Sequence, residues 1–415
     1  MPVDFAVAPL HISSETAPLR QVVVHTPGPE MGLVAPDNAE DLLFDDILFV
    51  EEAREEHRVL IRLFQAAVGE EDAVLQLTGL LRETFESKGA RHAYVDRLAE
   101  RLPGRNLEAY ADDLKSLAAE DLLHFAVTGQ APFSVTAQPL PNLMFTRDLS
   151  AVVGEHVLMS HAATAARAPE SVIIQTVYEH HPRFSAAQDH LIQLPEEVSF
   201  EGGDLLVVNE SLVLIGQSER TSLGGVLAAA RALIDRTPIE HVIMVNLPEE
   251  RYCMHLDTVF TFADADTCVV FPPIIEHDRD HVFLIEALDD HDLRLRPYPT
   301  LKDALEEVTG QSYTFIPCGG ADPVRQRREQ WTDGANLFAI RPGLVVGYDR
   351  NRATYAALRD EGFHIVDAES FLDFYGDSAP ASTDRIAVRL SGNELSRGRG
   401  GPRCMTMPLV RGHTP

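Results

Sequence analysis

Four segments of the chain share one pattern of polar and apolar positions. Each has an acidic residue, an apolar run of strand length, a short polar turn and a second apolar run. They are TRDLSAVVGEHVLMS from Thr146, GGDLLVVNESLVLIG from Gly202, HLDTVFTFADADTCVVF from His255 and TDGANLFAIRPGLVVGYD from Thr332. Short apolar runs separated by turn residues are typical of β-hairpins. The sequence therefore predicts four hairpins with an acid at each entrance.

Each predicted hairpin is followed by a helix-like stretch, and usually by a further strand. The helix-like stretches are 169–179, 222–234, 281–288 and 353–361, and the further strands include 241–246 and 312–316. The repeating unit is therefore strand, strand, helix, strand, which predicts an α/β fold. Arranged around an axis, such units bring their entrance acids together at one end. Those acids are Asp148, Asp204, Asp257 and Asp333. One such acid can simply cap a turn, but four in register are harder to explain in that way.

The N-terminal part has a different character. Residues 21–25 form one convincing strand, followed by TPGPE, and from 50 to about 125 apolar residues recur at helical spacing. Gly69, Gly89 and Pro103-Gly104 separate these helical patterns, which cover 74–85, 93–102 and 107–117 after the first. We expect residues 51–125 to form a bundle of four or five short helices. It is inserted into an α/β domain made of 1–50 and 126–415.

Composition excludes several classes of protein. The 64 acidic residues exceed the 35 basic ones and give a net charge of −29, which argues against binding nucleic acid or an anionic membrane. No apolar run approaches the length of a transmembrane helix, and the N-terminus does not resemble a secretory signal. The four cysteines lie far apart without a CxxC pair, which argues against a zinc knuckle or a disulfide scaffold. We therefore expect a cytoplasmic protein.

Cys404 lies in the most informative segment, SRGRGGPRCMTMPLVR. Its neighbours Arg397, Arg399 and Arg403 are expected to lower the thiol pKa, and the glycines allow a ligand to approach the backbone. The alternative is a buried structural cysteine. The other three cysteines lie among apolar or strand residues and are expected to be inert.

His255 and Asp257 lie two residues apart in CMHLDTVF. Alternation along a strand would place both on one face, where an imidazole beside a carboxylate suits acid/base chemistry. Two alternatives remain open here. His255 can be a core histidine, or it can bind a metal with Cys253 and Asp257, although that set lacks a nearby fourth ligand.

Further candidates are carboxylates and arginines. Glu201 and Asp204 flank the glycine pair of FEGGD and could accept hydrogen bonds from a cation, or the motif could be a bulged turn. PNLMFTRD contributes Asn142 and Asp148, with an Arg147–Asp148 structural pair as the alternative.

Two arginines follow the first two hairpins. Arg167 and Arg220 could present planar forks to a carboxylate, or lie on the surface. A thiol, an imidazole, carboxylates and arginines together suit a small molecule with a guanidinium at one end and a carboxylate at the other. Free arginine has that shape.

The ordered set of motifs resembles the arginine deiminases of the guanidino-group-modifying superfamily. It runs over nearly the whole chain, from VVVHTPGPEM and LLFDDILFVEEAREEH through PNLMFTRD, FEGGD, GQSERTS and CMHLDTVF to REQWTDGAN and GRGGPRCMTMPL. The resemblance implies a five-fold pseudosymmetric α/β propeller of ββαβ units with an inserted helical bundle. It also implies a homodimer or a larger assembly.

The resemblance also implies a role for each candidate. Cys404 is the nucleophile and His255 the acid/base; Asp148 and Asp257 hold the guanidinium, and Glu201 is a further carboxylate at that end. The substrate α-carboxylate is bound by Arg167 and Arg220. Asn142 lies at the amino-acid end, Arg399 is a mobile loop arginine near the mouth, and Asp204 is the acid of the GGD motif.

The implied reaction is hydrolysis of L-arginine to L-citrulline and ammonia through a covalent thiouronium adduct on the cysteine. It needs no metal or organic cofactor. The alternatives are a deiminase for another guanidino compound, such as agmatine or a methylarginine, or an amidinotransferase. A catalytically inactive binding propeller and a metal-dependent hydrolase are alternatives from other classes.

Overall fold

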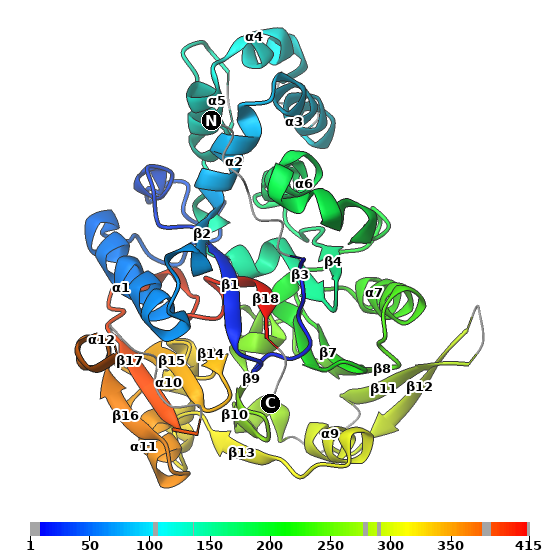
Figure 1. The fold of residues 1–415 in the computed structure, drawn as a ribbon, viewed down its shortest axis with the longest axis vertical. Coiled ribbons are helices and arrows are strands. Elements are labelled where there is room, and N and C mark those ends of the chain that lie inside the picture. The colour runs from blue at the N-terminus through cyan, green and yellow to red at the C-terminus, as the bar shows by residue number, and fades with distance from the viewer. Residues whose placement is uncertain are drawn as a thin grey trace.

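The computed structural model describes residues 9–102, 107–135, 137–276, 281–288, 292–375 and 383–412. Within these ranges the strands form five sheets, and helices pack on and between them (Figure 1). No helix in the described part of the chain is long and apolar enough to cross a membrane. The α/β fold class predicted from the repeating pattern is confirmed at this level.

All four predicted hairpins are present. They are β3–β4 (Ser150–Val153, His156–Met159), β6–β7 (Leu205–Asn209, Leu212–Gln217), β9–β10 (Phe260–Asp264, Thr267–Val270) and β14–β15 (Phe338–Arg341, Leu344–Tyr348), each antiparallel. The entrance acids occupy equivalent places. Asp148, Asp204 and Asp257 each lie in a short 3₁₀ turn just before the first strand, and Asp333 lies in a turn before β14.

A helix and a parallel strand complete each unit. The helices are α6 (Ala168–His180), α7 (Leu223–Arg236), α9 (Leu301–Thr309) and α11 (Arg352–Asp360). The parallel partners of the second hairpin strands are β5 (Leu191–Ile192), β8 (His241–Asn246), β13 (Thr314–Pro317) and β17 (Ile386–Leu390). In the last unit β16 (His364–Asp367) and α12 (Ala368–Tyr375) precede β17. Parallel pairing requires such crossovers, so the predicted order of elements is confirmed.

The helix predicted for 281–288 is wrong. Val282–Ala287 forms β11, which pairs with β8 and with β12 (Leu293–Tyr298) and extends the second sheet to the order β12-β11-β8-β7-β6. Figure 1 shows this ribbon projecting at the edge of the molecule. A continuous run of four apolar residues has no period that separates a strand from a helix.

The fifth sheet joins the two ends of the chain. It has the order β18-β1-β2, in which β18 (Met407–Arg411) is antiparallel and β2 (Val74–Gln76) parallel to β1 (Leu19–Val24). The strand predicted at 21–25 is confirmed, whereas residues 74–76, predicted as helix, form β2, and α2 (Leu77–Phe85) begins after them. Because β18 lies in this sheet, the loop with Cys404 is fixed close to the first hairpin: the backbone N–H of Arg147 donates to the Cys404 carbonyl.

The remaining helices fall into two groups. α1 (Val50–Val68) packs on α12 and β17, so it lies against the fourth sheet, which has the order β14-β15-β17-β16. α2, α3 (Lys88–Arg101), α4 (Ala111–Ser116) and α5 (Ala119–Thr128) gather with α6 at one end of the molecule (Figure 1). Buried Phe85, Tyr94 and Leu98 of this group join a hydrophobic core that continues into the sheet of β3, β4 and β5. Two short helices, α8 (Pro272–Ile275) and α10 (Pro323–Trp331), complete the chain.

Candidate active site

One pocket brings together side chains from the hairpin entrances and from the C-terminal loop. Seven of the ten predicted site residues line it: Asn142, Asp148, Arg167, Arg220, His255, Arg399 and Cys404. Asp257 and Glu201 lie behind this lining and contact it, and Asp204 lies outside it. The cavity left between the side chains has a volume of about 20 Å³. That is room for a water molecule and too little for an amino acid.

Cys404 is buried against Asp257. Its Sγ lies 3.8 and 3.9 Å from the two carboxylate oxygens, and its backbone N–H donates to Oδ1 of Asn336 at 3.1 Å. Asn336 in turn donates to the backbone carbonyl of Asp257 at 2.9 Å. One amide therefore connects the nucleophile candidate to the turn that carries Asp257.

The thiol pKa is raised, which is opposite to the sequence prediction. Burial is the largest cause, and the carboxylates of Asp257, Asp148 and Asp333 raise the pKa of Cys404 further. The three neighbouring arginines do not offset this, because their side chains pair elsewhere. Arg397 binds Asp46 and Glu394, Arg399 stacks on Trp331, and Arg403 binds Glu15 and Asp257.

His255 lies between two carboxylates. Its Nε2 is 2.9 Å from Oε2 of Glu201, and its Nδ1 is 3.7 Å from Oδ1 of Asp148. Burial lowers the pKa of His255, but Asp148 and the hydrogen bond with Glu201 raise it more, to about 9. The imidazole is therefore a proton donor at neutral pH. His255 and Asp257 do not lie on a strand as predicted: His255 is extended and Asp257 sits in the following 3₁₀ turn, which still brings both to the site.

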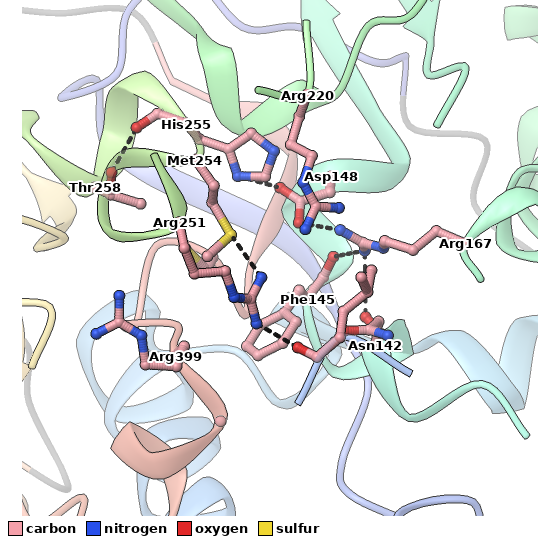
Figure 2. A pocket seen from close by; sticks show the side chains of 13 residues that line it. Asn142, Phe145, Asp148, Arg167, Arg220, Arg251, Met254, His255, Thr258 and Arg399 are labelled. Atoms are coloured by element: carbon pink, nitrogen blue, oxygen red, sulfur yellow. Dashed lines mark hydrogen bonds and ion pairs between the residues drawn. The ribbon is translucent and has the colours of Figure 1, made fainter. Parts of the chain in front are cut away.

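The guanidinium of Arg167 forms ion pairs with three acids. Its Nη1 lies 2.5 Å from Asp148 and 3.4 Å from Glu201, and its Nε lies 2.8 Å from Glu170. Its Nη2 makes only long bonds, of 3.3 and 3.4 Å, to the backbone carbonyls of Asn142 and Phe145. Figure 2 shows its guanidinium directed at Asp148, on the side opposite to His255. The surface alternative for Arg167 is therefore wrong, because the side chain is buried.

Arg220 enters the pocket from the turn after β7. It is buried, its Nη1 lies 3.8 Å from Glu201, and its Nε lies 3.4 Å from Glu219. Among the described interactions it has no short bond comparable to those of Arg167. Figure 2 shows its guanidinium beside Asp148 and Arg167.

Asp204 connects two loops of the site and does not face the pocket. It accepts hydrogen bonds from Ser218 Oγ at 2.7 Å and from the backbone N–H of Leu256 at 2.8 Å. Ser218 Oγ accepts from the backbone N–H of Arg220 at 3.0 Å. Burial raises the pKa of Asp204 to about 7, against the effect of nearby His255 and of these hydrogen bonds. In this structure the hydrogen bonds of Asp204 link the loop of Arg220 to the turn after His255, and its predicted substrate-binding role stays a prediction.

The glycine pair of FEGGD is needed for space. Neither Gly202 nor Gly203 has a positive φ. A β-carbon at Gly202 would lie 2.3 Å from the carbonyl oxygen of Arg147, and one at Gly203 would lie 2.7 Å from Oδ1 of Asp148. The bulged-turn interpretation, in which glycine supplies unusual dihedrals, is therefore wrong.

The metal alternative drawn from the sequence is also wrong in its ligands. Cys253 lies in a separate hydrophobic cluster, and its thiol donates to the carbonyl of Pro248 at 3.3 Å. One group in the described part of the chain has metal-like spacing, Asp148, Glu201 and His255, with possible ligand atoms within 4.8 Å of one another. The guanidinium of Arg167 already places a positive charge against both carboxylates of this group.

The mouth of the pocket contains residues that the sequence patterns did not indicate. Arg251 donates to the carbonyl of Leu43 and lies 3.3 Å from Asp45, and Arg399 lies 3.8 Å from the same Asp45. The guanidinium of Arg399 stacks on the ring of Trp331 with its centre 3.5 Å from the ring centroid. In Figure 2 it points away from Asp148 and His255. Arg399 was expected near the mouth from the resemblance, and the motifs LLFDDILFV and REQWTDGAN contain Asp45 and Trp331, but Arg251 was not singled out.

Comparison with known proteins places the chain. A family model described as arginine deiminase matches residues 106–411. An arginine deiminase of Listeria monocytogenes is 35% identical over 428 residues, which cover 97% of this chain and 98% of the relative. One of Bacillus cytotoxicus is 35% identical over 430 residues with the same coverage. The chain belongs to the arginine deiminase family. The resemblance drawn from its motifs is confirmed.

Solved structures share the fold at low sequence identity. The ternary complex of AgrE with ornithine and NAD+ has a TM-score of 0.53 at 13% identity and covers 95% of this chain and 40% of that one. DDAH from Pseudomonas aeruginosa, a cysteine-to-serine mutant complexed with citrulline, has a TM-score of 0.51 at 13% identity and covers 94% and 99%. At this low identity the two structures support the fold alone. The family assignment rests on the family model and on the arginine deiminases named above.

Proposed function

We propose that this enzyme hydrolyses L-arginine to L-citrulline and ammonia through a covalent adduct on Cys404. The observation that carries the proposal is the position of the Cys404 thiol, 3.8 Å from Asp257, in the same pocket as Asp148 and a protonated His255. Membership in the family supports the same reaction and the predicted class, a hydrolase acting on the C–N bond of a guanidinium.

In this proposal the carboxylates of Asp148 and Asp257 hold the substrate guanidinium against Cys404. Arg220 binds the α-carboxylate, since its guanidinium lies beside the pocket without a short bond of its own. Arg167 assists through Nη2, whose long bonds to neutral carbonyls are the least costly to exchange for a carboxylate. Its stronger bonds to Asp148 and Glu170 stay in place.

The substrate itself favours the reactive thiolate. Burial and three carboxylates raise the thiol pKa in the unliganded site. A guanidinium between Asp148 and Asp257 adds one positive charge that offsets part of their negative charge, so the pKa of Cys404 falls on binding. Cys404 then loses its proton to solvent, and the thiolate forms when the guanidinium carbon is in place for attack.

The chemistry follows from the same residues. The Cys404 thiolate attacks the guanidinium carbon, and Asp148 and Asp257 keep the group oriented as it becomes tetrahedral. His255 gives its proton to the leaving amine, which departs as ammonia and leaves the rest of the substrate bound to sulfur as a thiouronium. Neutral His255 then takes a proton from the attacking water, and collapse of the new tetrahedral carbon releases citrulline and the thiolate. Glu201 holds His255 through both steps.

Entry of the substrate requires rearrangement at the mouth. A cavity of about 20 Å³ cannot hold arginine, so side chains that close it must move. We propose that Arg399 and the loop of Asp45 open, and that Asn142, now donating to the carbonyl of Leu42 at 2.8 Å, faces the amino-acid end of the substrate.

At the level of the fold, we propose that the five sheets surround one axis as a pseudosymmetric propeller. The equivalent placement of the four hairpin-entrance acids supports this arrangement. For the domains we propose a narrower insert than 51–125. Since α1 packs on the fourth sheet and β2 pairs with β1, the inserted bundle begins at Leu77 and runs through α5. We also propose a cytoplasmic homo-oligomer, a location compatible with four unpaired cysteines.

The test is turnover of L-arginine, agmatine and methylarginines, measured as ureido product and ammonia. We expect L-arginine to be hydrolysed fastest, because the buried Arg220 contacts protein carboxylates only at 3.4 and 3.8 Å and is available to bind the substrate α-carboxylate. Turnover of agmatine but not of L-arginine would refute the substrate assignment. Transfer of the amidino group to an added amine, without matching ammonia and ureido product, would instead indicate an amidinotransferase.

A further inference from the structure

Arg403 directly precedes the nucleophile candidate, yet its side chain lies behind the pocket. It is buried, and its Nη1 donates to Oδ2 of Asp257 at 2.8 Å. Asp257 Oδ1 and Oδ2 lie 3.9 and 3.8 Å from the thiol, so the whole carboxylate is next to Cys404. Because Oδ2 already accepts from the guanidinium of Arg403, Oδ1 is the oxygen without that partner.

Glu15 holds the other side of the same guanidinium. Its two carboxylate oxygens accept from Nε and Nη2 of Arg403, each at 3.0 Å, and Nη2 also donates to the carbonyl of Leu205 at 2.8 Å. This is the bidentate geometry in which an arginine fork is most rigid. Burial raises the pKa of Glu15, but the charges of Arg403 and Arg147 lower it by more, so that the pKa is about 2. Glu15 is therefore a carboxylate.

Arg403 and Glu15 are 388 positions apart in the chain, so their ion pair joins the N-terminal and C-terminal segments behind the site. Glu15 is anchored to the second sheet, because its backbone N–H donates to the carbonyl of Val207 at 2.7 Å. Arg403 is anchored through the loop that also carries Cys404. The chain from Glu15 through Arg403 to Asp257 therefore links a sheet to the carboxylate that faces the thiol.

We propose that Arg403, fixed by Glu15, is a positioning residue that orients Asp257 toward the guanidinium of the substrate. The inference rests on the proposed function, in which Asp257 binds that guanidinium. Glu15 also balances the charge of Arg403, which would otherwise compete with the substrate for Asp257. Lysine cannot replace Arg403 in this role, because a single ammonium cannot hold Glu15 through two parallel bonds and Asp257 through a third.

The experiment compares Arg403→Lys and Glu15→Gln with the wild type. Arg411→Lys is the matched control: Arg411 is equally buried, but it donates to the backbone carbonyls of Ala17 and Ala339. Two quantities are measured for each purified full-length protein. They are KM and kcat for L-arginine, and the pH midpoint of Cys404 alkylation by iodoacetamide without substrate, followed on the Cys404 peptide by mass spectrometry.

We expect Arg403→Lys to keep the alkylation midpoint, since the charge is retained, and to raise KM about tenfold because Asp257 is misoriented. Glu15→Gln removes a negative charge behind Asp257, so the alkylation midpoint moves to lower pH and KM rises. Arg411→Lys leaves both quantities unchanged.

Equal KM values for Arg403→Lys and Arg411→Lys would overturn the proposal, as would an alkylation midpoint that Glu15→Gln leaves in place. If Arg403→Lys does not fold, Glu15→Gln still decides, because it keeps the shape of the pair. A wild type that does not hydrolyse L-arginine refutes the proposed function instead. The alkylation midpoints of the variants would still report on whether Arg403 and Glu15 act on the thiol site.

Discussion

Gly203 lies where Asp148 and His255 approach the backbone most closely. A β-carbon built there would lie 2.7 Å from Oδ1 of Asp148 and 2.8 Å from Cγ and Nδ1 of His255. Ordinary van der Waals contact begins near 3.4 Å. Gly203→Ala must therefore displace the imidazole or the backbone by about 0.6 Å, a value set by these distances.

Such a displacement acts directly on the proposed acid/base. Misplacement by about 1 Å can cost roughly 100-fold in rate, so we expect kcat for L-arginine to fall about tenfold or more. Overpacking of this kind costs about 1–3 kcal/mol, which urea unfolding measures without adding a guanidinium compound. The control is Gly79→Ala in α2, where the nearest atom would lie 3.7 Å from the new β-carbon.

The control variant should keep full activity and gain slightly in stability, because alanine favours a helix over glycine. Wild-type kcat in Gly203→Ala would refute the reasoning. It would mean that His255 does not need its present position, or that it is not the acid.

Three further outcomes follow from the ionisable groups. Glu201→Gln removes the negative charge that helps to hold the pKa of His255 at about 9, so the alkaline limb of the kcat profile should move to lower pH. Asp204→Asn keeps one acceptor for two donors, so kcat/KM should fall roughly tenfold as the loops of Arg220 and His255 loosen, with the melting temperature as the stability check. The pKa of Glu15 is lowered from 4.5 in the unfolded chain to about 2 in the folded protein. Between these two pH values the unfolded chain binds more protons, so the contribution of Glu15 to stability is lost as the pH falls from 4.5 to about 2. Acid unfolding of Glu15→Gln should consequently depend less on pH between these values than that of the wild type.

Much of the fold could be predicted because the hairpin pattern is local. An acid, two short apolar runs and a turn were enough to place Asp148, Asp257 and Asp333 at equivalent hairpin entrances. The pattern failed at β11, where consecutive buried and half-buried apolar residues remove the alternation that identifies a strand. It failed again at β2, a strand of three residues, which is shorter than any periodicity can reveal.

The site was predicted less completely because charge pairing is not local. The motifs named the thiol, the imidazole and the acids, but they could not show which carboxylates the arginines bind. Arg403 was expected to lower the thiol pKa as a sequence neighbour, whereas its guanidinium binds Glu15, at the other end of the chain, and Asp257. Arg167 was expected to bind the substrate carboxylate, whereas most of its N–H donors are bound to acids of the protein.

The most direct test of the central claim is to trap the covalent intermediate. L-arginine labelled at the guanidino carbon is mixed with the enzyme, the reaction is quenched in acid during turnover, and the peptides are analysed by mass spectrometry. The proposal predicts that the Cys404 peptide gains the mass of one labelled arginine less one ammonia, and that Cys404→Ser folds but forms neither adduct nor citrulline. Citrulline production by Cys404→Ser, or an adduct on another residue, would contradict it.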